Sequence, residues 1–127
     1  IEEPIKQFIS FRFEEICRSY FSLNAMSGKI KGITNIGIFY YDDSTTKSSG
    51  EFDVVLQKKG IETDFAYDVY EAKYYASPLS QGEMYKEAEK IRNLKGLTLG
   101  KIGFIAISGY EKEDDLFHCI SGEELYN

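Results

Sequence analysis

Two strand-like runs decide the fold of this chain: EFDVVL at residues 51–56 and DFAYDVYEAK at residues 64–73. Both runs are rich in β-branched and aromatic residues, and they are close enough in the chain to pair as a hairpin. Side chains alternate along a strand, so Glu71 and Lys73 share one face. If Asp53 lies beside Glu71, two carboxylates about 4 Å apart repel by roughly 4 kcal/mol at an effective dielectric of about 20. We expect a divalent cation and Lys73 to relieve that repulsion.

The segments around these runs predict two helices and three more strands. Pro4 and apolar residues at helical spacing between Ile5 and Tyr20, Ile16 among them, predict an amphipathic helix over about residues 4–23. The other expected elements are strands at residues 36–41, 101–108 and 116–120 and a helix at residues 81–97, with turns or loops at residues 24–35, 42–50, 58–60, 74–80 and 111–115. The order helix, three strands, helix, strand, strand predicts an α/β fold with a mixed central sheet flanked by helices.

The second expected helix has separate apolar and charged faces. Its apolar residues recur at helical intervals and predict the face that packs on the sheet: Met84, Ala88, Ile91 and Leu94. Its charged residues are expected to point largely outward: Glu83, Lys86, Glu87 and Lys90. Gly96 and Gly100 are expected to bracket its exit.

Length and charge limit the classes of function. With 127 residues, 43% of them hydrophobic, the chain can bury one core and is expected to form one domain. It opens at Ile1 without a methionine and leads at once into a helical pattern, so we expect it to be a piece of a longer polypeptide. A net charge of −6 argues against a simple nucleic-acid coat, but it does not exclude a nucleic-acid enzyme with a local basic strip.

The cysteine content and the hydropathy pattern indicate a cytoplasmic protein. Cys17 and Cys119 lie far apart among apolar neighbours, so they are expected to be buried packing residues in a reducing compartment and not a disulfide framework. No apolar stretch approaches the ~20 residues that a membrane span needs, and charged residues interrupt the first helix, unlike a signal peptide. We therefore expect no membrane partner.

The order of elements, with an acid on one strand and Glu-x-Lys on the next, resembles the PD-(D/E)xK, or restriction endonuclease-like, superfamily of nucleases. The matching residues are Asp53, Glu71 and Lys73. Glu14, on the first helix, looks like the family's first-helix glutamate, which often joins the metal site; Glu15 is the alternative. The resemblance implies a restriction endonuclease-like fold.

A closer resemblance covers nearly the whole chain and rests on four short stretches: FEEICR at residues 13–18, GEFDVV at 50–55, YEAK at 70–73 and ISGY at 107–110. They look like the nuclease-like C-terminal domain of certain archaeal and bacterial P-loop ATPases. This implies a single nuclease-like domain over residues 1–127 with a fused N-terminal ATPase region as partner. The chain has no Gly-x-x-x-x-Gly-Lys-Ser/Thr loop, so any ATP site belongs to that other region.

The superfamily resemblance implies a metal site and a reaction. Asp53 and Glu71 supply hard oxygen ligands suited to Mg²⁺ or Mn²⁺, and Glu14 completes the shell or holds a second ion. Lys73 orients or helps to deprotonate the attacking water and steadies the developing negative charge. The expected catalytic residues are thus Lys73, Asp53 and Glu71, and the expected metal ligands are Asp53, Glu71 and Glu14.

Two functions stay open at this point. The first is Mg²⁺-dependent hydrolysis of DNA, coupled to or regulated by an ATPase; the second is a non-catalytic regulatory or protein-interaction domain of that ATPase, which the acidic net charge favours. An acid pair near a lysine on neighbouring strands is also commonly a surface salt bridge of little energetic value. The oligomeric state and the preferred DNA structure are open as well.

Three further features have a structural and a functional interpretation. Residues 81–85, QGEMY, fit a Gln-x-x-x-Tyr pattern found near DNA in some members of the superfamily, but two fixed positions have little specificity. His118 is the sole histidine, and its place in a terminal strand favours a structural role over a catalytic one. The many tyrosines could stack on bases, although tyrosines more often cover sheet edges.

Overall fold

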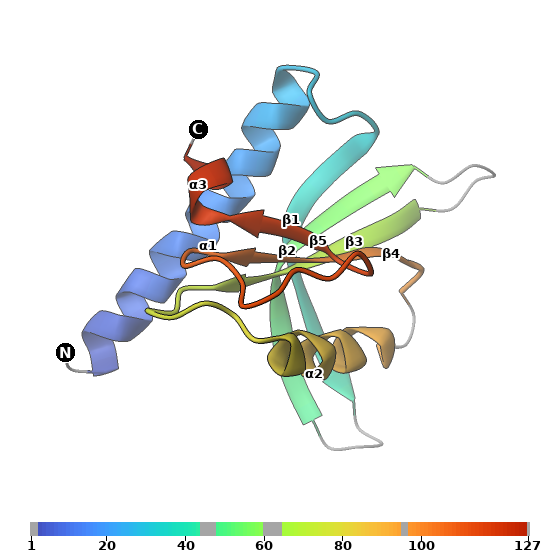
Figure 1. Ribbon diagram of the computed structural model, residues 1–127. Helices are drawn as coiled ribbons and strands as arrows, with labels where there is room; N and C mark the ends of the chain where they lie inside the picture. Colours follow the sequence, from blue (N-terminus) through green and yellow to red (C-terminus); the bar gives the residue numbers. More distant parts are fainter. Residues whose placement is uncertain (1–2, 44–47, 60–64, 95–96, 127) are drawn as a thin grey trace.

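The computed structural model describes the chain apart from residues 1–2, 44–47, 60–64, 95–96 and 127, and it describes no side chains for residues 3–10, 43, 48 and 49. Within the described part, the elements are α1 (Glu3–Met26), β1 (Ile33–Asp43), β2 (Ser48–Lys59), β3 (Phe65–Lys73), α2 (Gln81–Arg92), β4 (Leu99–Ala106), β5 (His118–Ser121) and α3 (Gly122–Leu125). The chain thus forms the α/β architecture that the sequence predicts, with a five-stranded mixed sheet flanked by helices (Figure 1).

The order of the strands in the sheet is their order in the chain, β1-β2-β3-β4-β5. β1, β2 and β3 pair antiparallel, whereas β3, β4 and β5 pair parallel. Antiparallel neighbours need only a short turn, but parallel neighbours need a crossover, and α2 lies in the crossover from β3 to β4. The mixed sheet follows from this change of connection after β3.

Each face of the sheet has its own apolar core because strand side chains alternate. On one face, Leu56 packs with the α1 residues Cys17 and Phe21 and with Leu125 of α3. On the other face, neighbouring strand residues pack with the apolar stripe of α2: Met84, Ala88 and Ile91. Figure 1 accordingly shows α3 beside α1, with α2 apart from both. The sheet therefore separates α1 and α3 from α2.

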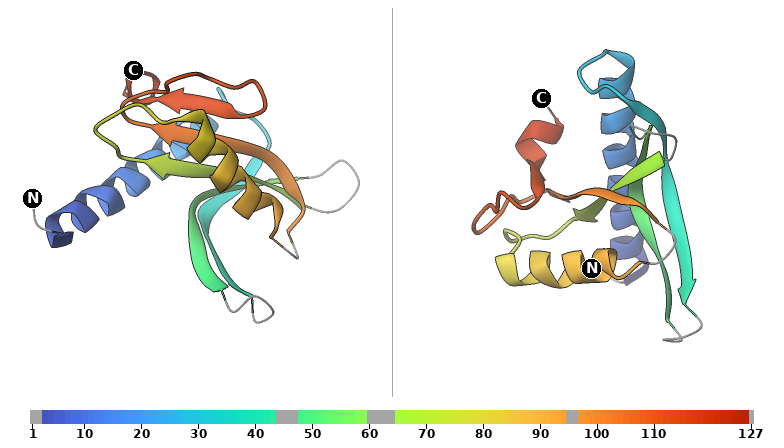
Figure 2. Two further views of the ribbon diagram at one scale, coloured as in Figure 1. Left: turned by 60° about the horizontal axis from the view of Figure 1, so that its bottom comes forward. Right: turned by 90° about the vertical axis from the view of Figure 1, so that its right-hand side faces the viewer.

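The hairpin of β1 and β2 is longer than the sequence predicts. The expected polar connection at residues 42–50 is partly strand, because Asp42 pairs with Ser49 and the ladder continues to the end of β1. β2 also continues through Lys58 and Lys59, which were expected in a turn and instead pair with β3. Backbone pairing satisfies the N–H and C=O groups of polar residues as well as apolar ones, so the hydrophobic pattern underestimates the strand. Both views in Figure 2 show this hairpin curving past α2.

Other element boundaries also differ from the prediction. α2 ends at Arg92 and not near residue 97, because Asn93 forms its C-cap and donates its backbone N–H to Glu89. β4 covers Leu99–Ala106 in place of 101–108, and a turn bond from Gly109 N–H to the Ala106 carbonyl closes it. β5 begins at His118 and not at residue 116, and α3 was not expected.

The first helix is confirmed, with two qualifications. α1 continues to Met26, and Ile16, expected on the buried stripe, is 38% exposed because it lies outside the Phe13, Cys17 and Phe21 series. The expected core contacts of Ile5, Phe8 and Ile9, and the expected positions of Gly60, Asp64 and Gly96, lie outside what the structure describes. Of the helices described, none has the length and apolar character needed to cross a membrane.

Candidate functional site

A β-bulge in β2 sets the position of Asp53. Three residue steps of β2, from Val55 to Phe52, lie opposite two steps of β1, so β2 contains one extra residue in this stretch. The ladder with β3 has its last pair at Val54 and Tyr70, immediately before Asp53. A bulge bends its strand and re-aims a side chain, and bulges recur beside functional sites. Asp53 is thus released from regular pairing on both sides.

α1 brings Glu14 to Asp53. Glu14 follows Phe13 and precedes Cys17 by three residues, so it belongs to the stripe of α1 that faces the sheet. The pKa of Glu14 is raised to about 8, mainly by burial and further by a hydrogen bond with Asp53 and by the Asp53 charge. Glu14 is therefore largely protonated near neutral pH, as expected for a carboxyl group that is buried beside a like charge.

β3 places Glu71 and Lys73 on the face covered by α2. Glu71 and Lys73 alternate with the α1-side residues Tyr70 and Ala72. Glu71 Oε2 lies 3.9 Å from Lys73 Nζ, and each side chain is only 14% exposed. Burial raises the pKa of Glu71 to about 7; Lys73 lowers it, while Glu87 and Asp53 raise it. The Asp53 charge thus acts on Glu71, although less than the charges of Lys73 and Glu87 do.

α2 contributes two acids to the surroundings of Lys73, Glu83 and Glu87, and the prediction that Glu87 points outward is wrong. Glu87 is buried, and its Oε1 lies 3.6 Å from Lys73 Nζ and 3.5 Å from Lys90 Nζ. Glu83 Oε1 lies 4.0 Å from Lys73 Nζ. A signal for Glu87 was present: it lies three residues after Met84 and four before Ile91, on the stripe that packs on the sheet. Glu87 was predicted to lie on the solvent-exposed face of the helix only because it is charged.

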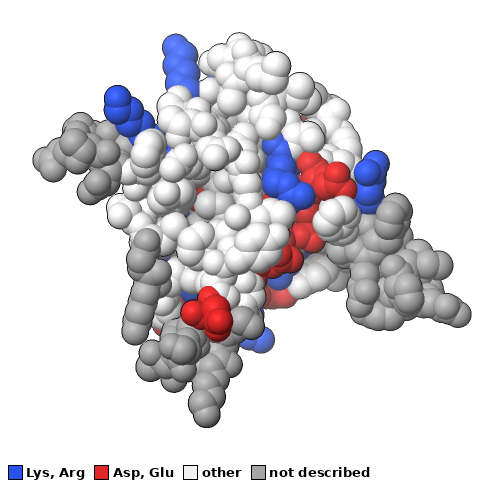
Figure 3. Space-filling model, turned by 180° about the vertical axis from the view of Figure 1, so that it is seen from behind, with Lys and Arg blue, Asp and Glu red and all other residues white. Residues whose placement is uncertain are grey.

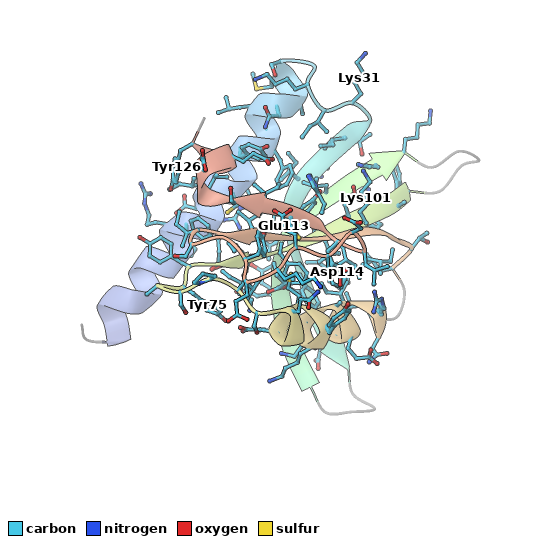
Figure 4. The ribbon with its side chains drawn as sticks, viewed as in Figure 1. Lys31, Tyr75, Lys101, Glu113, Asp114 and Tyr126 are labelled. Atoms are coloured by element: carbon cyan, nitrogen blue, oxygen red, sulfur yellow. The ribbon has the colours of Figure 1, made fainter. Side chains whose placement is uncertain are left out.

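Lys73 is therefore surrounded by acids. Burial by itself lowers the pKa of Lys73, but Glu87, Glu71, Tyr75 and Glu83 reverse this, and the pKa is raised. The Tyr75 hydroxyl donates a 2.5 Å hydrogen bond to Glu83 Oε1, and the Tyr75 ring centroid lies 5.7 Å from Lys73 Nζ. Figure 4 shows Tyr75 in the loop between β3 and α2. These acidic neighbours keep Lys73 protonated and positively charged.

The carboxyl groups of the site are the kind of ligand that hard cations prefer. Their arrangement in the structure, however, is not that of a formed metal site. Within the described residues, no group of three or more His, Cys, Asp or Glu side chains is arranged to hold a metal ion. The acids form two groups, Glu14 with Asp53, and Glu71 with the acids around Lys73. Protonation of Glu14 and Glu71 relieves the crowding near neutral pH. A cation could do the same with carboxylate oxygens as ligands.

Acidic side chains are unevenly distributed over the surface. In Figure 3, acidic atoms gather in one part of the face opposite to that of Figure 1, with Lys or Arg atoms at its border.

Arg18 was not among the site residues predicted from the sequence, but it contacts the site. Its Nη1 donates a hydrogen bond to the Asp53 backbone carbonyl at 2.6 Å. A basic residue one turn after Glu14 was a signal that could have revealed it.

The remaining candidates have structural contacts. Tyr85 and Gln81, the fixed residues of the Gln-x-x-x-Tyr pattern, both hydrogen-bond Asp114 and so attach α2 to the β4–β5 loop. His118 Nδ1 lies 2.5 Å from the Tyr70 hydroxyl. Cys17 is buried as expected, whereas Cys119 is half-buried, because it lies on the edge strand β5.

Comparisons with protein-family models, with curated proteins and with solved structures find no match to this chain.

Proposed function

We propose that this chain is a PD-(D/E)xK-like domain that hydrolyses phosphodiester bonds of DNA with Mg²⁺ or Mn²⁺, and that a fused ATPase region regulates it. The observation that carries the proposal is that Asp53 of β2 interacts with two acids of raised pKa, Glu14 of α1 at about 8 and Glu71 of β3 at about 7, with burial as the largest cause of both shifts. Perturbed carboxyl groups gathered beside a lysine are typical of functional sites.

In this proposal each side chain has one role. Asp53 and Glu71 would hold the metal, with Glu14 as a further ligand, and the ion would supply Lewis acidity and lower the pKa of a water molecule. Lys73 orients that water and stabilises negative charge on the phosphate oxygens. Glu87, 3.6 Å from Lys73 Nζ, keeps the ammonium group near Glu71.

A specific observation favours a second candidate, a non-catalytic regulatory or protein-interaction domain of the same ATPase. The acids of the described residues form no ready group of three ligands, and Lys73 is already matched by Glu71, Glu83 and Glu87. In that case the cluster is a closed ionic network, which needs neither a metal nor a substrate.

Cleavage by an Asp53→Ala variant tests the proposed reaction. We expect the wild type to cleave labelled duplex, single-stranded or branched DNA with Mn²⁺, and Asp53→Ala to lose about a hundredfold or more of the rate, because a metal ligand is removed. Asp115→Ala, at an exposed position on the β4–β5 loop, is the matched control and should cleave like the wild type.

Circular dichroism and thermal unfolding of both variants establish that the fold is intact. Equal cleavage by wild type and Asp53→Ala would refute the assignment. A folded wild type that cleaves none of the three substrates with either ion would favour the non-catalytic candidate.

A further inference from the structure

Arg18 lies at the border of the acidic site and makes an unusual set of contacts. It is half-buried on α1, one turn after Glu14, and its Nη1 donates to the carbonyl of Asp53 at 2.6 Å. A guanidinium group has five N–H donors in a rigid fork. The bond to Asp53 fixes the group in place and leaves most of its donors for another acceptor.

The charge of Arg18 has no direct carboxylate partner. Among the residues whose side chains are described, no Asp or Glu oxygen lies within 4.0 Å of it, whereas Arg12 on the same helix pairs with Glu15 at 3.7 Å. A partly buried cation without a matching anion is costly to fold, which is the situation expected of a group that binds an anion from outside.

We propose that Arg18 binds a backbone phosphate of the DNA strand and holds that strand beside Asp53, which makes it a further substrate-binding residue of the site. This inference depends on the proposed function. The fork geometry of Arg suits a phosphate, because two N–H groups reach two oxygens together. Because the carbonyl bond links Arg18 to Asp53, a phosphate on its free donors lies next to the acids that the reaction uses. A phosphate adjacent to the scissile one occupies such a position.

The test is the salt dependence of DNA binding. We would measure the anisotropy of a labelled short duplex and a labelled single strand, with Ca²⁺ in place of Mg²⁺, over a series of NaCl concentrations. Arg18→Gln should weaken binding about tenfold, the value of one charge-assisted contact. It should also reduce the slope of log affinity against log salt by about 0.9 on the duplex or about 0.7 on the single strand. The strand with the larger loss identifies the substrate form.

Two variants separate phosphate binding from a structural role. Arg12→Gln is the matched control, because it removes the same charge from the exposed face of the same helix, and it should leave affinity and slope near wild type. Arg18→Lys keeps the charge and loses the fork, so it should keep the slope with an intermediate affinity. A role limited to anchoring the Asp53 carbonyl predicts lower stability for both Arg18 variants and an unchanged slope.

Several outcomes would overturn the inference: equal binding by Arg18→Gln and Arg12→Gln, an unchanged salt slope, or no DNA binding by the wild type. Arg18-dependent capture of an acidic peptide without DNA binding would assign the residue to a protein partner instead. Failure of the proposed reaction gives a different pattern. A wild type that binds DNA through Arg18 but does not cleave it retains this inference and refutes the nuclease.

Discussion

The two ends of the β2–β3 hairpin combine lysine and carboxylate in opposite ways. At one end, Lys58 Nζ lies 2.6 Å from Asp68 Oδ2, and Asp68 Oδ1 accepts a 2.7 Å hydrogen bond from the Lys101 backbone N–H. At the other end, the nearest acid oxygen to Lys73 Nζ lies 3.6 Å away, and three acids surround that one ammonium group. The first pair is short and balanced in charge; the second is loose and has an excess of acid.

The difference shows that residue types alone do not separate a structural ion pair from a candidate site. Both ends have an acid and a lysine on neighbouring strand segments, and both are largely buried. At the Lys73 end, three acids from β3 and α2 exceed the two nearby ammonium groups, and the Asp53 charge also acts on Glu71, so that protonation or a bound cation must compensate. We infer that the excess of buried acid, and not the presence of a pair, indicates function.

The largest expected effect is on the balanced pair. Asp68→Ala should lower the free energy of unfolding by about 3 kcal/mol, because it leaves Lys58 without its partner and the Lys101 N–H without its acceptor. Asp68→Asn keeps an acceptor oxygen and should cost less. Urea unfolding measures both values. A loss below about 1 kcal/mol for Asp68→Ala would contradict the description of this pair as structural.

The next effect is the pH dependence of the acid-rich end, measured in metal-free buffer. Glu14 and Glu71 have pKa values of about 8 and about 7 in the folded chain and an ordinary value of 4.5 when unfolded. Folding therefore takes up protons in this range, and the free energy of unfolding must fall as the pH rises from about 4.5 to about 8. After allowance for solvent screening, we expect a fall of roughly 2 kcal/mol from these two groups.

The double variant Glu14→Gln with Glu71→Gln isolates that contribution. Because neither amide titrates, the variant should lose this fall and should be as stable as or more stable than the wild type near pH 8. Urea unfolding at several pH values gives the comparison. Parallel curves for the two proteins would mean that these carboxyl groups are not perturbed by folding.

The smallest effect sets the reference level for both ends. Arg12 and Glu15 form a 3.7 Å pair on the surface of α1, with side chains 62% and 41% exposed. Arg12→Ala should change the free energy of unfolding by about 0.5 kcal/mol or less, because exposed pairs gain little in water. A loss comparable to that of Asp68→Ala would remove the contrast between exposed and buried pairs.

The sequence predicts the center of the site better than its surroundings. The alternation of side chains was enough to put Glu71 and Lys73 on one face of β3, and the hairpin brought the Asp53 charge within reach of Glu71, because both depend on local chain geometry. These arguments use periodicity, which a single sequence displays. Glu14 was named through the resemblance to the superfamily's first-helix glutamate, and not through its place on α1.

What the sequence did not predict depends on tertiary packing. The bulge that frees Asp53 from the ladder is a mismatch between two strands, and neither strand shows it alone. Glu87 was assigned to solvent by its charge, although burial beside Lys73 compensates that charge. Arg18 is distinguished by a bond to a carbonyl thirty-five positions away, which no local pattern encodes.

The most direct test of the central claim, that buried excess acid forms a cation site, is calorimetric titration with Mn²⁺ near pH 7 in two buffers of different ionisation enthalpy. The account predicts binding that releases protons, because Glu14 and Glu71 must lose theirs, and less release above about pH 8. Glu71→Gln should weaken the affinity tenfold or more, by roughly the loss of one ligand, while Glu89→Gln on the exposed part of α2 should not. Absence of Mn²⁺ binding, or equal binding without proton release in all three proteins, would contradict it.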